Sequence, residues 1–186
     1  MKIFIVIISG FVYTTLLGQI KADPLPFQGK WSKTSGSAPQ YLNGTLVNFA
    51  NFGFTRSQYD FKPDSTYIFH SESKQSSNAY ILTDEEGRYL VVNNELTIAP
   101  EKCVAKMLDA NGALKETRVI TSGKRYYTWQ MVYFEGIDET QFVLTAAQEN
   151  FIDGGFSANN AYPNSFMYGN KTEPEWQFPA EQNSND

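Results

Sequence analysis

Residues 59–72, YDFKPDSTYIFHSE, contain two short alternating segments on either side of a turn sequence. Tyr59 and Phe61 precede the turn, and Tyr67 and Phe69 follow it. Side chains two residues apart share one face of a β-strand. The proline-aspartate pair between the segments favours a reverse turn, because proline fixes φ and aspartate caps the turn. The stretch therefore predicts an antiparallel hairpin with its four aromatic rings directed inward.

Two more hairpins are predicted downstream. Residues 88–98, RYLVVNNELTI, read as two strands around an Asn-Asn turn, since asparagine tolerates positive φ. Residues 102–108 and 114–120 flank an Asn-Gly dipeptide, which is the strongest short hairpin signal. Further strands are expected over 125–134 and 141–147.

The predicted strands recur about every ten residues, with hardly a helix between them. The acidic run at residues 84–87, DEEG, is predicted to be a solvated turn, and the Gly-, Asn- and Pro-rich residues after Asn150 are predicted to wrap around the strands. This spacing is typical of antiparallel meanders. The sequence therefore predicts an all-β fold, an antiparallel meander β-barrel, with a β-sandwich as the alternative.

Residues 1–22 have the order of a secretory signal peptide. Lys2 precedes the apolar run 3–18, and cleavage is expected after Ala22 or after Gly18. The apolar run is shorter than the roughly 20 residues needed to span a bilayer. The mature protein is therefore expected to have no membrane span and to be secreted or periplasmic.

The remaining residues, 23–186, are expected to form a single domain with its core over residues 27–168 and a disordered tail over residues 177–186. The formal net charge is −5 and the sequence pI is about 4.9. An acidic chain without clustered Lys and Arg is a poor partner for phosphate backbones, so nucleic acid binding is not expected. The sequence does not predict the oligomeric state.

Cys103 is the only cysteine, so an intrachain disulfide is excluded. We interpret it as a small core residue, with a reactive or intermolecular thiol as the alternative. Asn43 and Asn170 each begin a glycosylation sequon, which has a consequence only in a eukaryotic source.

Several segments together resemble small exported bacterial proteins of the lipocalin-like, calycin type. These segments are residues 27–31 (FQGKW), 59–67, 87–100, 125–129 (RYYTW) and 153–156 (DGGF). The resemblance implies a lipocalin-like barrel rather than a particular activity. In lipocalins, a tryptophan near the start of the chain closes one barrel end and stacks with an arginine from a late strand. The resemblance assigns these roles to Trp31 and Arg125, which would meet in a cation–π contact.

Residues 125–134 carry the candidate ligand-binding face. With a period of two, Tyr127, Trp129, Met131 and Tyr133 share one side of this strand. Aromatic walls with few polar groups are typical of ligand pockets, so these residues are predicted to line a site for a small apolar or aromatic compound. The alternative is that they fill the interior of the barrel, which would make the protein a structural or interaction module.

Enzymatic function is not expected. His70 is the only histidine, and on a strand it shares a face with Glu72 while Ser71 points to the other side. A serine nucleophile needs a base within hydrogen-bonding reach, so a hydrolase or isomerase that uses His70 is a distant third hypothesis. One histidine and one cysteine are too few for a zinc or copper site, and no metal or cofactor is predicted.

Overall fold

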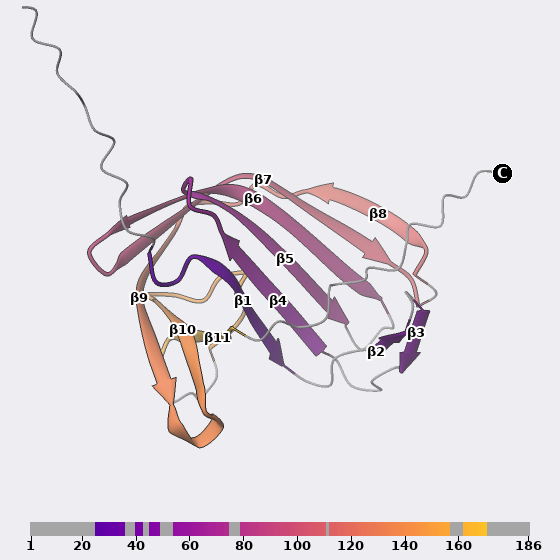
Figure 1. Ribbon diagram of the computed structural model, residues 1–186. Helices are drawn as coiled ribbons and strands as arrows, with labels where there is room; N and C mark the ends of the chain where they lie inside the picture. The colour runs from indigo at the N-terminus through magenta and orange to yellow at the C-terminus, as the bar shows by residue number, and fades with distance from the viewer. Residues whose placement is uncertain are drawn as a thin grey trace, which may run out of the picture.

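The computed structural model describes residues 25–35, 40–42, 45–48, 54–74, 79–110, 112–156 and 162–170, and these residues are almost entirely strands and turns (Figure 1). The strands are β1 (Gly29–Ser35), β2 (Gln40–Leu42), β3 (Thr45–Asn48), β4 (Phe54–Phe61), β5 (Thr66–Lys74), β6 (Tyr80–Val92), β7 (Glu95–Leu108), β8 (Leu114–Val119), β9 (Arg125–Phe134), β10 (Glu139–Ala146) and β11 (Ser165–Gly169). A single 3₁₀ turn, η1 (Glu135–Ile137), joins β9 to β10 in this part of the chain. None of the described helical segments is long and apolar enough to cross a membrane.

The strands close into a ring of antiparallel pairs. In order around the ring, β1 is followed by β4, β5, β6, β7, β9, β10 and β11, and β11 pairs with β1. β8 pairs with the last residues of β7, and β2 pairs with β3 in a separate small sheet (Figure 1). The all-β antiparallel meander predicted from the sequence is confirmed, and the ring of hydrogen bonds is that of a barrel.

The hairpin of residues 59–72 is confirmed in its register. Tyr59 pairs with Phe69 and Phe61 pairs with Tyr67, and all four rings are buried. The turn closes with a hydrogen bond from the Ser65 amide to the carbonyl of residue 62 at 3.2 Å. Burial of both aromatic pairs fixes this register, because a slip by one residue would expose every ring.

The acidic run is not a turn, and this prediction is wrong. Residues 84–87 lie within β6, which runs without a break and pairs with β7 along its length. Glu86 pairs with Lys102 and Gly87 pairs with Pro100, so Glu101 of β7 is the extra residue of a bulge at this point. A Cβ atom on Gly87 would lie 2.3 Å from the carbonyl oxygen of Ala99, so the close approach of the two strands requires glycine here. Alternation along β6 turns Glu85 into the barrel, where its side chain is fully buried.

The prediction for the residues after Asn150 misses a strand. β11 lies between β10 and β1 and completes the ring, while the segment before it enters the barrel through Ile152 and Asp153, both of which are buried. The hairpin between β7 and β8 is confirmed, and Gly112 takes a positive φ of 83° in its turn. β7 is one strand that serves two partners: its first residues pair with β9 and its last residues pair with β8.

Some expectations fall outside the described residues. They are the signal peptide over residues 1–22 with its cleavage sites, the tail over residues 177–186, and the sequon at Asn43.

Candidate functional site: a polar cluster inside the barrel

One end of the barrel interior is filled by aromatic rings. Phe27 lies at the centre of this group, with ring centroids 4.7 Å from Trp129, 5.0 Å from Phe142 and 5.2 Å from Phe61. Trp31 is buried beside them and donates its indole N–H to the Phe27 carbonyl at 2.7 Å. Trp31 is therefore part of the aromatic core, and its role in closing a barrel end stays a prediction.

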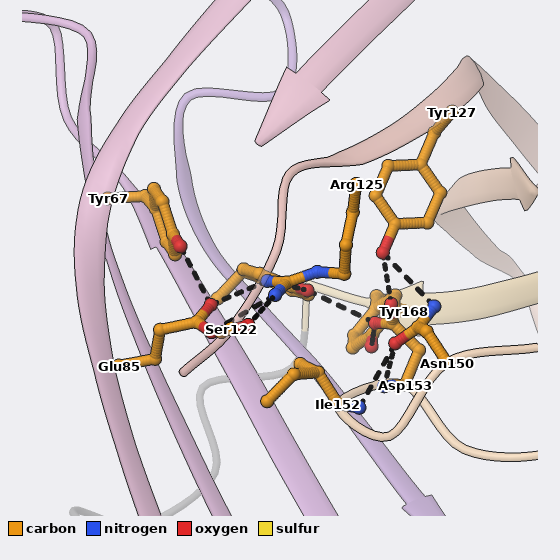
Figure 2. A network of polar contacts seen from close by, with 10 residues as sticks. Tyr67, Glu85, Ser122, Arg125, Tyr127, Asn150, Ile152, Asp153 and Tyr168 are labelled. Carbon is orange, nitrogen blue, oxygen red and sulfur yellow. Dashed lines mark hydrogen bonds and ion pairs between the residues drawn. The ribbon is translucent and has the colours of Figure 1, made fainter. Parts of the chain in front are cut away.

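Next to this aromatic end lies a buried ion pair. Arg125, the first residue of β9, donates from Nη2 to Glu85 Oε1 at 2.5 Å and from Nη1 to Glu85 Oε2 at 3.0 Å (Figure 2). The Tyr67 hydroxyl donates to the same carboxylate at 2.7 Å. The guanidinium and the carboxylate face each other through two parallel hydrogen bonds. Each buried charge is therefore compensated by the other.

A second buried carboxylate, Asp153, accepts hydrogen bonds from three tyrosine hydroxyls. Tyr127 donates to Oδ2 at 2.5 Å, Tyr59 donates to Oδ1 at 3.2 Å, and Tyr168 donates to the same Oδ1 (Figure 2). Arg125 Nη2 donates to the Tyr59 hydroxyl at 3.4 Å, so the two carboxylates belong to one network. We give the name polar cluster to the residues of this network together with Asn150 and Lys33. Its members are Lys33, Tyr59, Tyr67, Glu85, Arg125, Tyr127, Asn150, Asp153 and Tyr168.

Local turn chemistry brings Asp153 into the barrel. The side-chain oxygen of Asn150 accepts the backbone amides of Ile152 at 3.0 Å and Asp153 at 2.8 Å, while Asn150 Nδ2 donates to the Tyr127 hydroxyl at 3.2 Å. The Gly154 amide donates a hydrogen bond to the Asn150 carbonyl oxygen, and Gly154 has a φ of 94°, which favours glycine. The turn at residues 150–154 therefore directs a carboxylate inward.

Lys33 of β1 also approaches this turn. Its ammonium donates to the Asp153 carbonyl oxygen and lies over the rings of Phe166 at 5.0 Å and Tyr168 at 5.4 Å. Burial lowers the pKa of Lys33, and the nearby Asp153 carboxylate opposes that shift. The barrel wall thus presents a cation to the turn as well as hydroxyl groups.

Burial sets the protonation state of the tyrosines. Desolvation raises the pKa of Tyr59, Tyr127 and Tyr168, and the negative charge of Asp153 raises it further. Desolvation, followed by the charge of Glu85, raises the pKa of Tyr67 in the same way. All four phenols are therefore hydrogen-bond donors at neutral pH.

Cys103 lies beside this network. It pairs in register with Glu85, is 1% exposed, and has a pKa raised to about 11, first by burial and then by the charge of Glu85. A buried neutral thiol is a poor nucleophile, which agrees with the interpretation of Cys103 as a core residue.

The predicted ligand-binding face is divided in the structure. Tyr127 belongs to the polar cluster, and Trp129 and Met131 are partly buried against the aromatic end. Tyr133 is 57% exposed and donates its hydroxyl to Asp138 at 2.6 Å. The shared face is therefore present over the first part of β9, but the hairpin of β9 and β10 carries Tyr133 out to solvent.

Trp31 and Arg125 are both buried, but the charge of Arg125 has another partner. The guanidinium is held by Glu85 and Tyr59, and its Nη1 also donates to Ser122 at 3.0 Å. The ring of Trp31 packs on Phe142, with centroids 5.7 Å apart. A carboxylate is a stronger partner for a buried guanidinium than an aromatic face, which accounts for this arrangement.

His70 is on the outer face of β5, as alternation predicts. Its Nδ1 lies 2.6 Å from Asp84 Oδ1 on the neighbouring strand. Ser71 points inward, where its hydroxyl lies 3.5 Å from that of Ser57. The described residues contain no group of three His, Cys, Asp or Glu side chains that could hold a metal ion.

The sequence interpretation missed Glu85 and Asp153, which carry both negative charges of the polar cluster. Glu85 lies in a run of three acidic residues, which favoured a solvated turn, and Asp153 lies in a Gly-rich segment, which also favoured a turn. A signal for Glu85 existed: counted by twos from Tyr89, alternation places it on the inward face. Asp153 had no comparable signal, because it reaches the interior through a turn.

Comparisons of the chain with protein-family models, curated proteins and solved structures found no significant match. The site itself is therefore the basis for any functional conclusion.

Proposed function

We propose that this protein binds a small apolar or aromatic molecule inside its barrel, as a non-enzymatic carrier or sequestering protein. The observation that carries the proposal is the convergence of hydrogen-bonding groups, including Arg125 and Lys33, beside a wall of aromatic rings. Ligand sites are typically apolar walls with a few convergent polar groups.

Two buried donors add support. In the part of the chain that the structure describes, Trp129 Nε1 and Arg125 Nε are buried without a hydrogen-bond acceptor. Buried N–H groups normally have a partner, and an acceptor on a bound molecule would provide one. Trp129 is also one of the residues that the sequence assigns to the ligand-binding face.

The proposal includes the remaining sequence expectations. A signal peptide over residues 1–22 would place the protein outside the cytoplasm, and the lipocalin-like resemblance fits a barrel with an internal site. The separation of His70 from Ser71 on opposite faces of β5 supports a non-enzymatic role.

The second candidate is an interaction module with a filled barrel. It is favoured by a row of exposed apolar side chains on the outer face of β6 and β9. Leu90 is 62% exposed and Tyr126 is 66% exposed, and both are register partners of Thr97 on β7. Val92, also exposed, extends the row. Exposed apolar patches often mark protein contacts.

A binding measurement separates the two candidates. Native mass spectrometry of gently purified protein is expected to show a co-purified small molecule, and that compound is expected to raise Tm. Tyr127→Phe removes one hydroxyl of the polar cluster and should weaken binding, whereas Tyr126→Phe, the next residue on the outer face, should not. If no adduct is found and no compound of any class raises Tm, the carrier function is wrong.

A further inference from the structure

We propose that the barrel wall contains a carboxylate-binding site that the protein's own Asp153 occupies, and that a small carboxylic acid takes this site by displacing the turn at residues 150–154. The inference rests on the proposed function and specifies its ligand class. The ligand is an acid with a compact aliphatic or aromatic body. In the ligand-free protein, the Asp153 carboxylate then occupies the position that the carboxylate of the ligand would take.

The donors of this site belong to the barrel, and the acceptor does not. Tyr59 lies on β4, Tyr127 on β9 and Tyr168 on β11, and all three hydroxyls converge on one carboxylate. These strands are fixed in the ring by their neighbours, so the donors are held in position independently of the turn. A preorganised set of donors binds a free acid without an ordering cost of its own.

The site recognises a carboxylate in particular. Both oxygens of Asp153 are used: Oδ1 accepts from Tyr59 and Tyr168, and Oδ2 accepts from Tyr127. Burial and the adjacent negative charge raise the tyrosine pKa values, so that the hydroxyls remain donors. An amide would direct its own N–H groups toward donors, and an amine would meet Arg125 and Lys33. Two acceptor oxygens with a negative charge fit the site best.

The turn has a small buried anchor. Between residues 150 and 154, only Ile152 and Asp153 are buried, while Phe151 between them is 71% exposed. The backbone is held within the turn by the Asn150 side chain and by the Gly154 amide, and from β1 by the Lys33 ammonium, which donates to the Asp153 carbonyl oxygen. An acid that supplies its own carboxylate and an apolar body in place of Ile152 would replace both anchors at once. The structural change is confined to this turn and leaves the strands in place.

Chemical rescue tests the site directly. Asp153→Ala deletes the carboxylate and should lower Tm, and formate or acetate should then raise Tm with saturation, by roughly 5–10 °C at a hundredfold excess over Kd. Sodium chloride at equal ionic strength, formamide and acetamide should not. Asp138→Ala is the matched control, because it removes an exposed carboxylate that accepts one tyrosine hydroxyl, from Tyr133. The Tm of Asp138→Ala should be the same in acetate as in chloride.

The wild-type protein provides a second measurement that does not depend on the folding of Asp153→Ala. Benzoate is expected to increase cleavage by chymotrypsin after Phe151, because displacement of the turn releases the backbone that the Asn150 side chain and the Gly154 amide hold in a turn, and benzamide is expected not to. Asn150→Ala loosens the turn without touching its carboxylate, and should raise the affinity for benzoate several-fold.

The outcomes are separable. Equal effects of benzoate and benzamide on cleavage, or rescue of Asp153→Ala by chloride as well as by formate, would overturn the carboxylate site. If neutral aromatic compounds still bind in a way that depends on Tyr127, the proposed carrier function stands and only the carboxylate site is wrong. Binding of no compound of either class would overturn both proposals.

Discussion

Replacing Glu85 with alanine would leave Arg125 buried without its carboxylate. The two side chains are 0% and 8% exposed, and the guanidinium would retain only the neutral oxygens of Ser122 and Tyr59 as partners. Tyr67 would also lose its acceptor. Removing one member of a buried ion pair typically costs about 3–5 kcal/mol.

That cost is large on the scale of the whole protein. A chain of this size has a free energy of unfolding of about 5–15 kcal/mol, and 1 kcal/mol corresponds to about 2–4 °C in Tm. We therefore expect Glu85→Ala to lower Tm by roughly 10 °C, measured by circular dichroism and confirmed by urea denaturation.

The exposed pair of Arg118 and Glu116 on β8 is the internal control. Its side chains are 72% and 39% exposed, and Arg118 donates to Glu116 through two nitrogens. Glu116→Ala should leave Tm unchanged within error, because solvent screens such pairs. Equal, small effects of Glu85→Ala and Glu116→Ala would refute the buried ion pair. A double variant, Glu85→Leu with Arg125→Met, should recover much of the loss, since neither charge of this ion pair remains.

Three further predictions follow from the same interior. The four buried tyrosines have folded-state pKa values above their unfolded value near 10, so their contribution to stability is complete below pH 10 and is lost as the pH rises toward the folded values. Lys33, whose pKa is lowered, opposes this trend only below about pH 10.5. Tyrosinate absorbance should therefore rise together with loss of the circular dichroism signal, and titration of all 11 tyrosines near pH 10 with the fold intact would contradict this. Gly87→Ala should cost about 1–3 kcal/mol in urea denaturation because its Cβ would meet the Ala99 carbonyl at 2.3 Å, whereas Gly136→Ala, with open space around it, should not. Cys103 should react with a thiol reagent at pH 8 only as fast as the protein unfolds, and fast labelling of the folded protein would disprove its burial.

The hairpins could be predicted from the sequence because their signals are local. Turn residues and period-two alternation lie within a few positions of each other around residues 59–72, and burial of the aromatic rings fixes the register. The same local reading failed at residues 84–87. Composition favoured a turn there, but the charge of Glu85 is balanced by Arg125, which is far away in the sequence.

The candidate site was less predictable for the same reason. Its parts come from β1, β4, β5, β6, β9 and β11 and from one turn, and only the closed ring brings them together. Tyr127 was identified because it lies on an alternating strand. The short β11 lacked a long alternating pattern, although its Tyr168 supplies one of the three hydroxyls on Asp153.

Closure of the ring depends on the pairing of β1 with β11, where Ser32 meets Gly169. These are the first and last described strands, so this contact is among the most non-local in the fold, and such contacts slow folding because loop entropy is lost before they form. Until β11 arrives, one edge of β1 and one edge of β10 remain unpaired, and unpaired edges recruit other chains. A nascent or truncated chain that lacks β11 would thus be prone to aggregate.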